Sequence, residues 1–199
     1  RTFWEGCTFA QPWTRTSADP WCNIFRNSFP AADRQVNLER ARMLAAMEDP
    51  SPDAVAKVTS LLTDTSDAID DVHYLAVLSR LPGARSEDAT KRIAAALLSL
   101  DRKYETAKLS RDSYWPLRIG EAAGELVRLD SRLAAALVDS PGFGRPDHAL
   151  YAKLTGVDAT AAARKFLLAA SRDADYEWTP GLVALLGKLP ETETSALLK

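Results

Sequence analysis

Several features that point to particular classes of protein are missing from this sequence of 199 residues. It has no run of about 18 apolar residues that could cross a membrane as a helix. It also has no stretch of about six residues in which apolar and polar side chains alternate, the pattern of a strand. The 25 Lys and Arg and 27 Asp and Glu residues are interspersed, so no basic stripe marks a nucleic-acid surface. We expect neither a transmembrane segment nor nucleic-acid binding.

The usual motifs of catalysis and cofactor binding are missing as well. No C-x-x-C marks a zinc or redox site, and no C-x-x-C-H marks haem attachment. The H-E-x-x-H of zinc proteases, the G-x-S-x-G of hydrolases and the glycine-rich phosphate loops do not occur. The sequence therefore predicts no catalytic residues, no cofactor and no metal, and we expect the chain not to be an enzyme.

What the sequence does contain is a succession of amphipathic helices. Apolar residues make up 46% of the chain and charged residues 26%, as in ordinary globular domains. From residue 33 onward, alanine- and leucine-rich stretches at helical spacing alternate with turn signals. The predicted helices cover residues 34–48, 52–62, 66–81, 86–104 and 115–137 with a corner at 129–132, followed by helices starting at Pro146, Asp158 and Thr179, the last dividing near 190.

The starts of these helices carry recognisable capping residues. Ser51 precedes Pro52, which suits the first position of a helix. Four acids fall within eight residues at Asp64, Asp67, Asp70 and Asp71. They lack the spacing and glycine of a calcium loop, whereas acids at a helix start are favoured by the helix dipole. We predict that they cap a helix. A second acidic pair, Glu121 and Glu125, lies one turn apart and predicts a solvated helix face.

Three segments share one plan, in which an acid and an aromatic residue precede an apolar helix, a polar corner and a second Ala/Leu helix. They are DVHYLAVLSRLPGARSEDATKRIAAALL, DSYWPLRIGEAAGELVRLDSRLAAALV and DYEWTPGLVALLGKLPETETSALL. RPDHALYAKLTGVDATAAARKFLLAA fits with a shorter first helix. The starts lie about 30–40 residues apart, the period of helical-hairpin solenoids. In this the chain resembles the HEAT-like α-α repeat proteins.

The resemblance implies an all-α fold of stacked antiparallel helical hairpins, a HEAT-like α-α superhelix. A two-helix unit of this length cannot bury its own apolar stripe, so neighbouring hairpins must stack to form a continuous core. A compact orthogonal helical bundle would use the same pattern and stays open as an alternative. For function, the resemblance implies an extended surface that binds other proteins.

The N-terminal stretch WEGCTFAQPWTRTSADPWCNIF differs from the rest of the chain. It holds three of the five tryptophans and both cysteines, and Pro12 and Pro20 disfavour a helix. We therefore predict two parts, a non-helical aromatic arm over residues 1–32 and an α-α repeat domain over residues 33–199. The arm would cover the exposed apolar end of the repeats or dock on a partner.

The two cysteines allow two interpretations. A Cys7–Cys22 disulfide would close a loop of about 15 residues and stabilise it by roughly 3 kcal/mol. The alternative is a pair of buried thiols that pack as small hydrophobic side chains. A disulfide would indicate a periplasmic or extracellular location and reduced thiols a cytoplasmic one. The location and the oligomeric state are not predicted further.

The two histidines, His73 and His148, occupy corresponding places in DDVHYL and RPDHAL, near helix starts. No nucleophile elbow or zinc motif accompanies either of them, so we predict that both cap or pack rather than catalyse.

Aromatic residues offer the best candidates for a binding surface. Tyr74, Tyr114, Trp115, Tyr176 and Trp178 begin successive repeats. If these residues are aligned and exposed, they would form an interaction ridge. If they are buried, they would fill the seams between hairpins. The Tyr114–Trp115 doublet points in two directions, so at least one ring should be partly exposed. The candidate interaction residues are Trp4, Trp13, Trp21, Tyr114, Trp115 and Trp178.

Taken together, these patterns predict a non-catalytic scaffold or protein-interaction module with one or more protein partners. The chain starts at Arg1 without a methionine, so we expect a processed product or part of a longer protein. The alternative is a structural helical subunit of a multi-component enzyme or redox complex.

Overall fold

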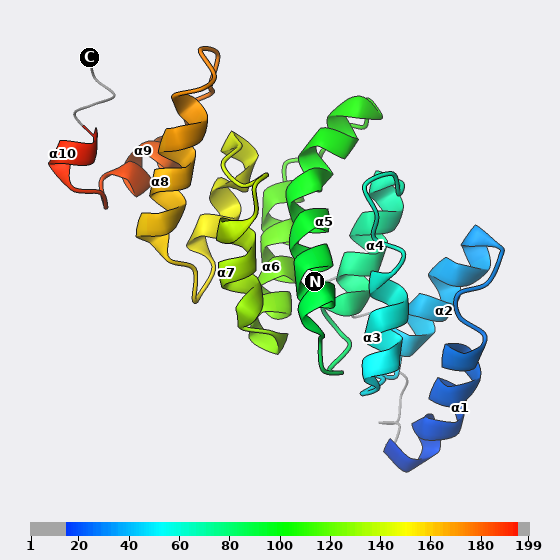
Figure 1. Ribbon diagram of the computed structural model, residues 1–199. Coiled ribbons are helices and arrows are strands. Elements are labelled where there is room, and N and C mark those ends of the chain that lie inside the picture. The colour runs from blue at the N-terminus through cyan, green and yellow to red at the C-terminus, as the bar shows by residue number, and fades with distance from the viewer. Residues whose placement is uncertain (1–14, 195–199) are drawn as a thin grey trace. The chain divides into compact units, whose positions relative to one another are not determined.

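The computed structural model describes residues 15–194, and all regular secondary structure in this range is helical (Figure 1). This confirms the predicted all-α class for the described part of the chain. The chain divides into two compact units, of which the first ends at Ala89 and the second begins at Thr90. The sequence instead predicts a boundary near residue 32, because the amino-acid composition changes there.

The first unit is built from four helices, coloured blue to cyan in Figure 1. They are α1 (Arg15–Asn27), α2 (Arg34–Ala46), α3 (Pro52–Thr59) and α4 (Ala68–Leu78). α2 packs against α1 and α4, and α3 packs against α4. Leu44 from α2, Val58 from α3 and Leu75 and Leu78 from α4 are fully buried between them. Burial of each such side chain stabilises the fold by roughly 1.5–3 kcal/mol.

The helix starts in this unit are capped as the sequence indicates. Ser51 Oγ accepts a hydrogen bond from Asp53 N with Pro52 in the first turn. Asp67 Oδ1 accepts from Ile69 N at 2.8 Å, and Asp70 and Asp71 lie in the first turn of α4. The prediction that these acids stabilise a helix start is confirmed for Asp67, Asp70 and Asp71, since they complement the positive end of the helix dipole.

The prediction of a non-helical arm is wrong for residues 15–27, which form α1. Pro20 lies inside this helix although proline removes a backbone donor there. α1 is held by tertiary contacts: Arg26 forms a 2.9 Å ion pair with Asp49, and its carbonyl accepts from Lys57 Nζ at 2.8 Å. Packing and ion pairing therefore outweigh the tendency of Pro20 to disrupt a helix. Residues 1–14 of the predicted arm lie outside the described residues.

The second unit contains most of α5 (Glu87–Thr106) and all the later helices, coloured green to red in Figure 1. These are α6 (Trp115–Leu129), α7 (Arg132–Asp139), the 3₁₀ helix η2 (Pro146–Lys153), α8 (Ala159–Ala170), α9 (Pro180–Leu186) and α10 (Glu191–Thr194). η2 contacts α6, α8 and α9, and α8 contacts α7 and α9. The largest fully buried side chains of this unit come from α5, α6, α7, η2 and α8.

Local sequence features predict the helix boundaries of this unit well. α6 ends at Leu129 and α7 begins at Arg132, which is the predicted corner. Asp158 caps α8 and Thr179 caps α9, each accepting backbone N–H hydrogen bonds. In the loop before η2, Gly144 has a φ of +127°, a backbone conformation that glycine adopts without strain. The helix predicted after Pro146 is a 3₁₀ helix rather than an α-helix.

Candidate functional site

The structure places the predicted interaction residues in different surroundings. Trp4, Trp13 and Cys7 lie outside the described residues, so neither the arm surface nor the disulfide is tested. Trp21 on α1, Tyr114 before α6 and Trp178 before α9 are exposed, with 49%, 62% and 43% of their surfaces accessible. Trp115 is half-buried. The predicted doublet thus has one ring facing solvent and one facing the protein.

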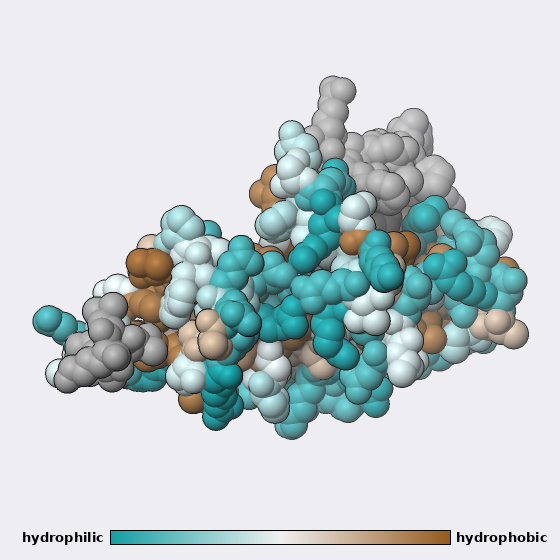
Figure 2. All heavy atoms as spheres, turned by 90° about the horizontal axis from the view of Figure 1, so that it is seen from above, coloured by the Kyte–Doolittle hydropathy of each residue, from teal (hydrophilic) through white to brown (hydrophobic). Residues whose placement is uncertain are grey.

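The start of α6 presents two large exposed apolar side chains close together. Tyr114 is 62% and Leu117 is 58% accessible. Residues three apart on a helix lie on one face, so the two side chains are neighbours. We call Tyr114 and Leu117 the α6 patch. Elsewhere, Figure 2 shows hydrophilic side chains over much of the viewed surface, with apolar side chains in separate, smaller areas.

The backbone under the α6 patch is fixed by several contacts. Asp112 accepts hydrogen bonds from Tyr114 N through its carboxylate and from Trp115 N through its carbonyl, at 2.9 and 3.0 Å. The same carboxylate pairs with Arg118 at 3.1 Å. The Trp115 ring packs on Tyr104, with ring centroids 4.3 Å apart. The patch therefore offers apolar side chains on a fixed backbone, so a partner need not order the helix start when it binds.

Trp178, like Trp115, packs against a second aromatic side chain. Its ring makes an edge contact with Tyr176, with centroids 5.2 Å apart. The Tyr176 hydroxyl donates a 2.7 Å hydrogen bond to the carbonyl of Gly144. Burial raises the pKa of Tyr176 to about 12, so the hydroxyl keeps its proton and the hydrogen bond at neutral pH. Tyr176 is a packing residue that holds Trp178 partly exposed.

Cys22 is buried within the first unit. Only 2% of its surface is accessible, and its Sγ lies 3.9 Å from Met47 Sδ at the end of α2. This environment suits a small hydrophobic side chain. The contact connects α1 to α2 through two sulfur atoms.

The two histidines make corresponding contacts. His73 Nε2 lies 3.0 Å from the carbonyl oxygen of Leu38 on α2, and His148 Nε2 lies 3.0 Å from that of Leu98 on α5. Burial lowers the pKa of His73, and it lowers the pKa of His148 to about 4. Both rings are therefore neutral at pH 7, and each joins its own segment to the backbone of a preceding helix. This supports the predicted packing role.

Around His148 lies a buried polar cluster that was not among the predicted sites. Asp101 Oδ2 lies 3.4 Å from His148 Nε2, and Asp101 Oδ1 accepts from Arg111 at 3.2 Å. Arg111 also pairs with Asp147 at 3.0 Å. Asp101 is 4% accessible and its Oδ2 makes no hydrogen bond to a described residue. Burial, followed by the negative charge of Asp147, raises the pKa of Asp101 to about 7.

The hydrogen bonds of His148 decide what this cluster can do. Its Nδ1 accepts from Gly144 N at 3.2 Å while its Nε2–H points to the Leu98 carbonyl. Both nitrogens are occupied and the residue is fully buried, so the ring has no position from which to take a substrate proton. The neighbouring Tyr151 hydroxyl donates to the carbonyl of Leu97 at 3.0 Å. The cluster therefore joins η2 to α5 as a structural element.

Among residues 15–194, no three His, Cys, Asp or Glu side chains come together as a metal site. In the same range, no helix has the length and apolarity needed to cross a membrane.

No protein-family model, curated protein or solved structure matches this chain. The resemblance to HEAT-like repeats therefore rests on the sequence pattern and remains a prediction.

A signal for the buried cluster was present in the sequence. Leu97, Leu100, Asp101 and Tyr104 follow the spacing of one helix face, so an acid stands within the apolar stripe of α5. All four side chains are buried. An acid at such a position points to a buried polar partner, although its identity depends on the fold.

Proposed function

We propose that this chain is a non-catalytic helical-repeat scaffold that binds a protein partner through the α6 patch. The observation that carries the proposal is the pair of exposed, adjacent side chains Tyr114 and Leu117 on a helix start with fixed geometry. Tyrosine is enriched among the residues that dominate binding energy in protein interfaces, and Leu117 enlarges the apolar surface beside it.

The repeat character of the scaffold is supported by the two histidine contacts. In each unit a histidine near a helix start approaches the carbonyl of a helix earlier in the chain, at the same 3.0 Å. Equivalent contacts at equivalent sequence places are typical of repeated structural units. Each of these contacts lies within its own unit.

A crosslinking experiment tests the proposal. p-Benzoylphenylalanine replaces Leu117 in the full chain expressed in its source cells, and Ile69, 52% accessible on α4, is the control position. We expect a partner protein to be crosslinked to position 117 and no protein to be crosslinked to position 69. The identified partner, once purified, should bind Tyr114→Ala/Leu117→Ala at least about tenfold more weakly, while Ile69→Ala binds normally. Equal binding of both variants would refute a role for the α6 patch.

A further inference from the structure

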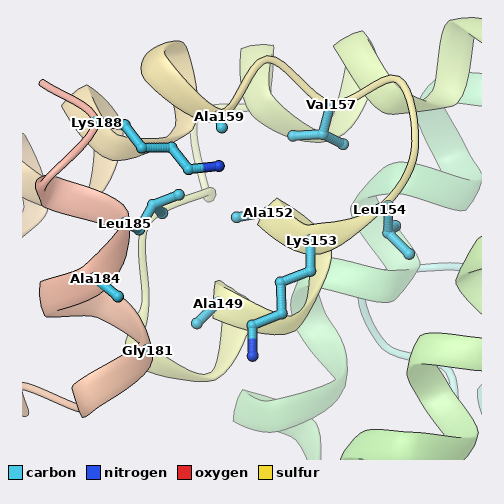
Figure 3. A pocket seen from close by; sticks show the side chains of 10 residues that line it. All are labelled: Ala149, Ala152, Lys153, Leu154, Val157, Ala159, Gly181, Ala184, Leu185 and Lys188. Carbon is cyan, nitrogen blue, oxygen red and sulfur yellow. The ribbon is translucent and has the colours of Figure 1, made fainter.

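An apolar groove opens on the second unit between η2, the start of α8, and α9 (Figure 3). Its volume is about 450 Å³, within the range of about 300–1,000 Å³ that is typical of ligand sites. Apart from two lysines, the lining residues are small or aliphatic: Ala149, Ala152, Leu154, Val157, Ala159, Gly181, Ala184 and Leu185.

Short side chains on facing elements create the groove. Ala149 and Ala152 of η2 face Gly181 and Ala184 of α9 across the hollow, and Leu185 is buried against it. Three of these residues are alanines and one is a glycine, so the elements pack without filling the space between them. A Cβ atom at Gly181 would lie 3.9 Å from Lys153 Nζ and from Thr179 Oγ1, so the facing elements leave room for it. The groove opens to solvent at the exposed Ala184.

Two ammonium groups border this apolar floor. Figure 3 shows Lys153 and Lys188 entering from different elements, with their amino groups on different sides of the groove. Both side chains are exposed, and within residues 15–194 neither forms an ion pair with a carboxylate. In the same unit, Arg145 and Arg164 do pair, with Glu105 and Glu193. The groove therefore combines apolar surface with positive charge that the described residues leave unneutralised.

We propose that this groove binds an acidic peptide segment of a partner protein, one that inserts an aliphatic or aromatic side chain between two carboxylates. The inference rests on the proposed scaffold function and names a second surface for it. The carboxylates match the lysines by charge, and the apolar side chain covers the alanine floor. Two separated ammonium groups favour a peptide over a fatty acid, which carries a single carboxylate at one end.

A peptide library provides the probe. Random 12-residue peptides displayed on phage are selected on the full chain, and the enriched peptides are synthesised with a fluorescein label. We expect enriched peptides with at least two Asp or Glu residues around a Leu, Ile, Phe or Trp. Fluorescence anisotropy then measures their affinities for the wild type and the variants below at several salt concentrations, since exposed charge pairs weaken with salt.

Matched variants separate the groove from general charge. Lys153→Glu/Lys188→Glu should lower affinity at least about tenfold, through repulsion of the acidic peptide. Arg102→Glu/Arg172→Glu changes the net charge equally at exposed positions outside the groove and should change affinity less than about twofold. Ala184→Phe fills the groove without changing charge and should also lower affinity at least about tenfold. Circular dichroism checks that each variant is folded.

The outcomes distinguish this inference from the proposed function. Enriched peptides without acids, or equal binding by the Lys153→Glu/Lys188→Glu variant, would overturn the groove proposal. The proposal would also be overturned if the selection enriched no acidic peptide while sodium laurate bound the chain in a way that depends on the two lysines. If the partner crosslinked at Leu117 binds the lysine variant normally and no acidic peptide binds, the α6 patch stands and the groove proposal fails. If acidic peptides bind the groove but no protein crosslinks at 117, the α6 patch fails instead.

Discussion

Asp101 Oδ2 lies 3.4 Å from His148 Nε2 in the interior of the second unit, and burial shifts the two pKa values in opposite directions. The pKa of Asp101 rises from 3.8 to about 7, and that of His148 falls from 6.5 to about 4. Between pH 4 and 6.5 the folded chain holds a proton on Asp101 that the unfolded chain has released. Over the same range it lacks the proton that unfolded His148 carries.

In the wild type, the contributions of Asp101 and His148 to the pH dependence of stability should therefore cancel. A group that binds more protons when folded makes stability fall as pH rises, and one that binds fewer makes it rise. Asp101 acts in the first way and His148 in the second. We expect the pair to contribute little net pH dependence between pH 4 and 6.5, as measured by urea unfolding across that range. A steep slope that both Asp101→Asn and His148→Gln abolish would contradict this expectation.

In the Asp101→Asn variant, the contribution of His148 to the pH dependence of stability should remain alone. The unfolding free energy of this variant should rise with pH from 4 to 6.5, by about 3 kcal/mol more than in the wild type, because one pKa unit corresponds to about 1.4 kcal/mol and the variant loses the opposing contribution of Asp101. His148→Gln keeps a donor and an acceptor without titrating, and its stability should fall as pH rises from 4 to 7. Urea unfolding at four pH values measures both slopes, and slopes of the same sign would contradict the assignment.

Removal of the His148 ring should destabilise the fold more than removal of the His73 ring. His148 is fully buried and loses hydrogen bonds at both nitrogens, whereas His73 is half-buried. We expect His148→Ala to lower the unfolding free energy by about 3 kcal/mol and His73→Ala by about 1–2 kcal/mol. Chemical denaturation measures both, and an equal loss would show that burial does not set the difference.

The ion pair between Arg26 and Asp49 should matter more than those at the surface. Asp49 is fully buried and its carboxylate accepts two bonds from the Arg26 guanidinium, at 2.9 and 3.0 Å. Arg26→Ala would leave a buried carboxylate without its cation and should cost about 3 kcal/mol. Arg118→Ala, which breaks an exposed pair with Asp112, should cost less than about 1 kcal/mol. Similar losses in the two variants would contradict this assignment.

Two glycines should respond in opposite ways to alanine. A Cβ atom at Gly83 would lie 2.6 Å from the backbone oxygen of Ser51, so Gly83→Ala should cost about 1–3 kcal/mol. A Cβ at Gly120, within α6, meets nothing within 4 Å, so Gly120→Ala should stabilise by about 0.5–1 kcal/mol. Thermal unfolding of the two variants checks the opposite signs, and a melting temperature raised by Gly83→Ala would contradict the close contact.

Much of the fold was predictable because its signals are local. Apolar spacing and caps such as Ser51 and Asp158 placed most helices within a few residues. The sequence does not predict α1, because Pro20 disfavours a helix locally, while the contacts that hold α1 come from Asp49 and Lys57, more than 20 residues away. The sequence does not predict the groove for the same reason. It is formed by small residues of η2 and α9, which only the fold brings together.

The contacts at the end of α1 also affect how the first unit opens. Arg26 and Lys57 join α1 to the segment that carries Asp49 and to α3. Detaching α1 alone would leave the Asp49 carboxylate without its cation, which raises the free energy of local opening of this helix. Backbone amides of α1 and α3 should therefore exchange with solvent deuterium through a common opening event. A chain shortened to begin at residue 33 would lose that cooperativity.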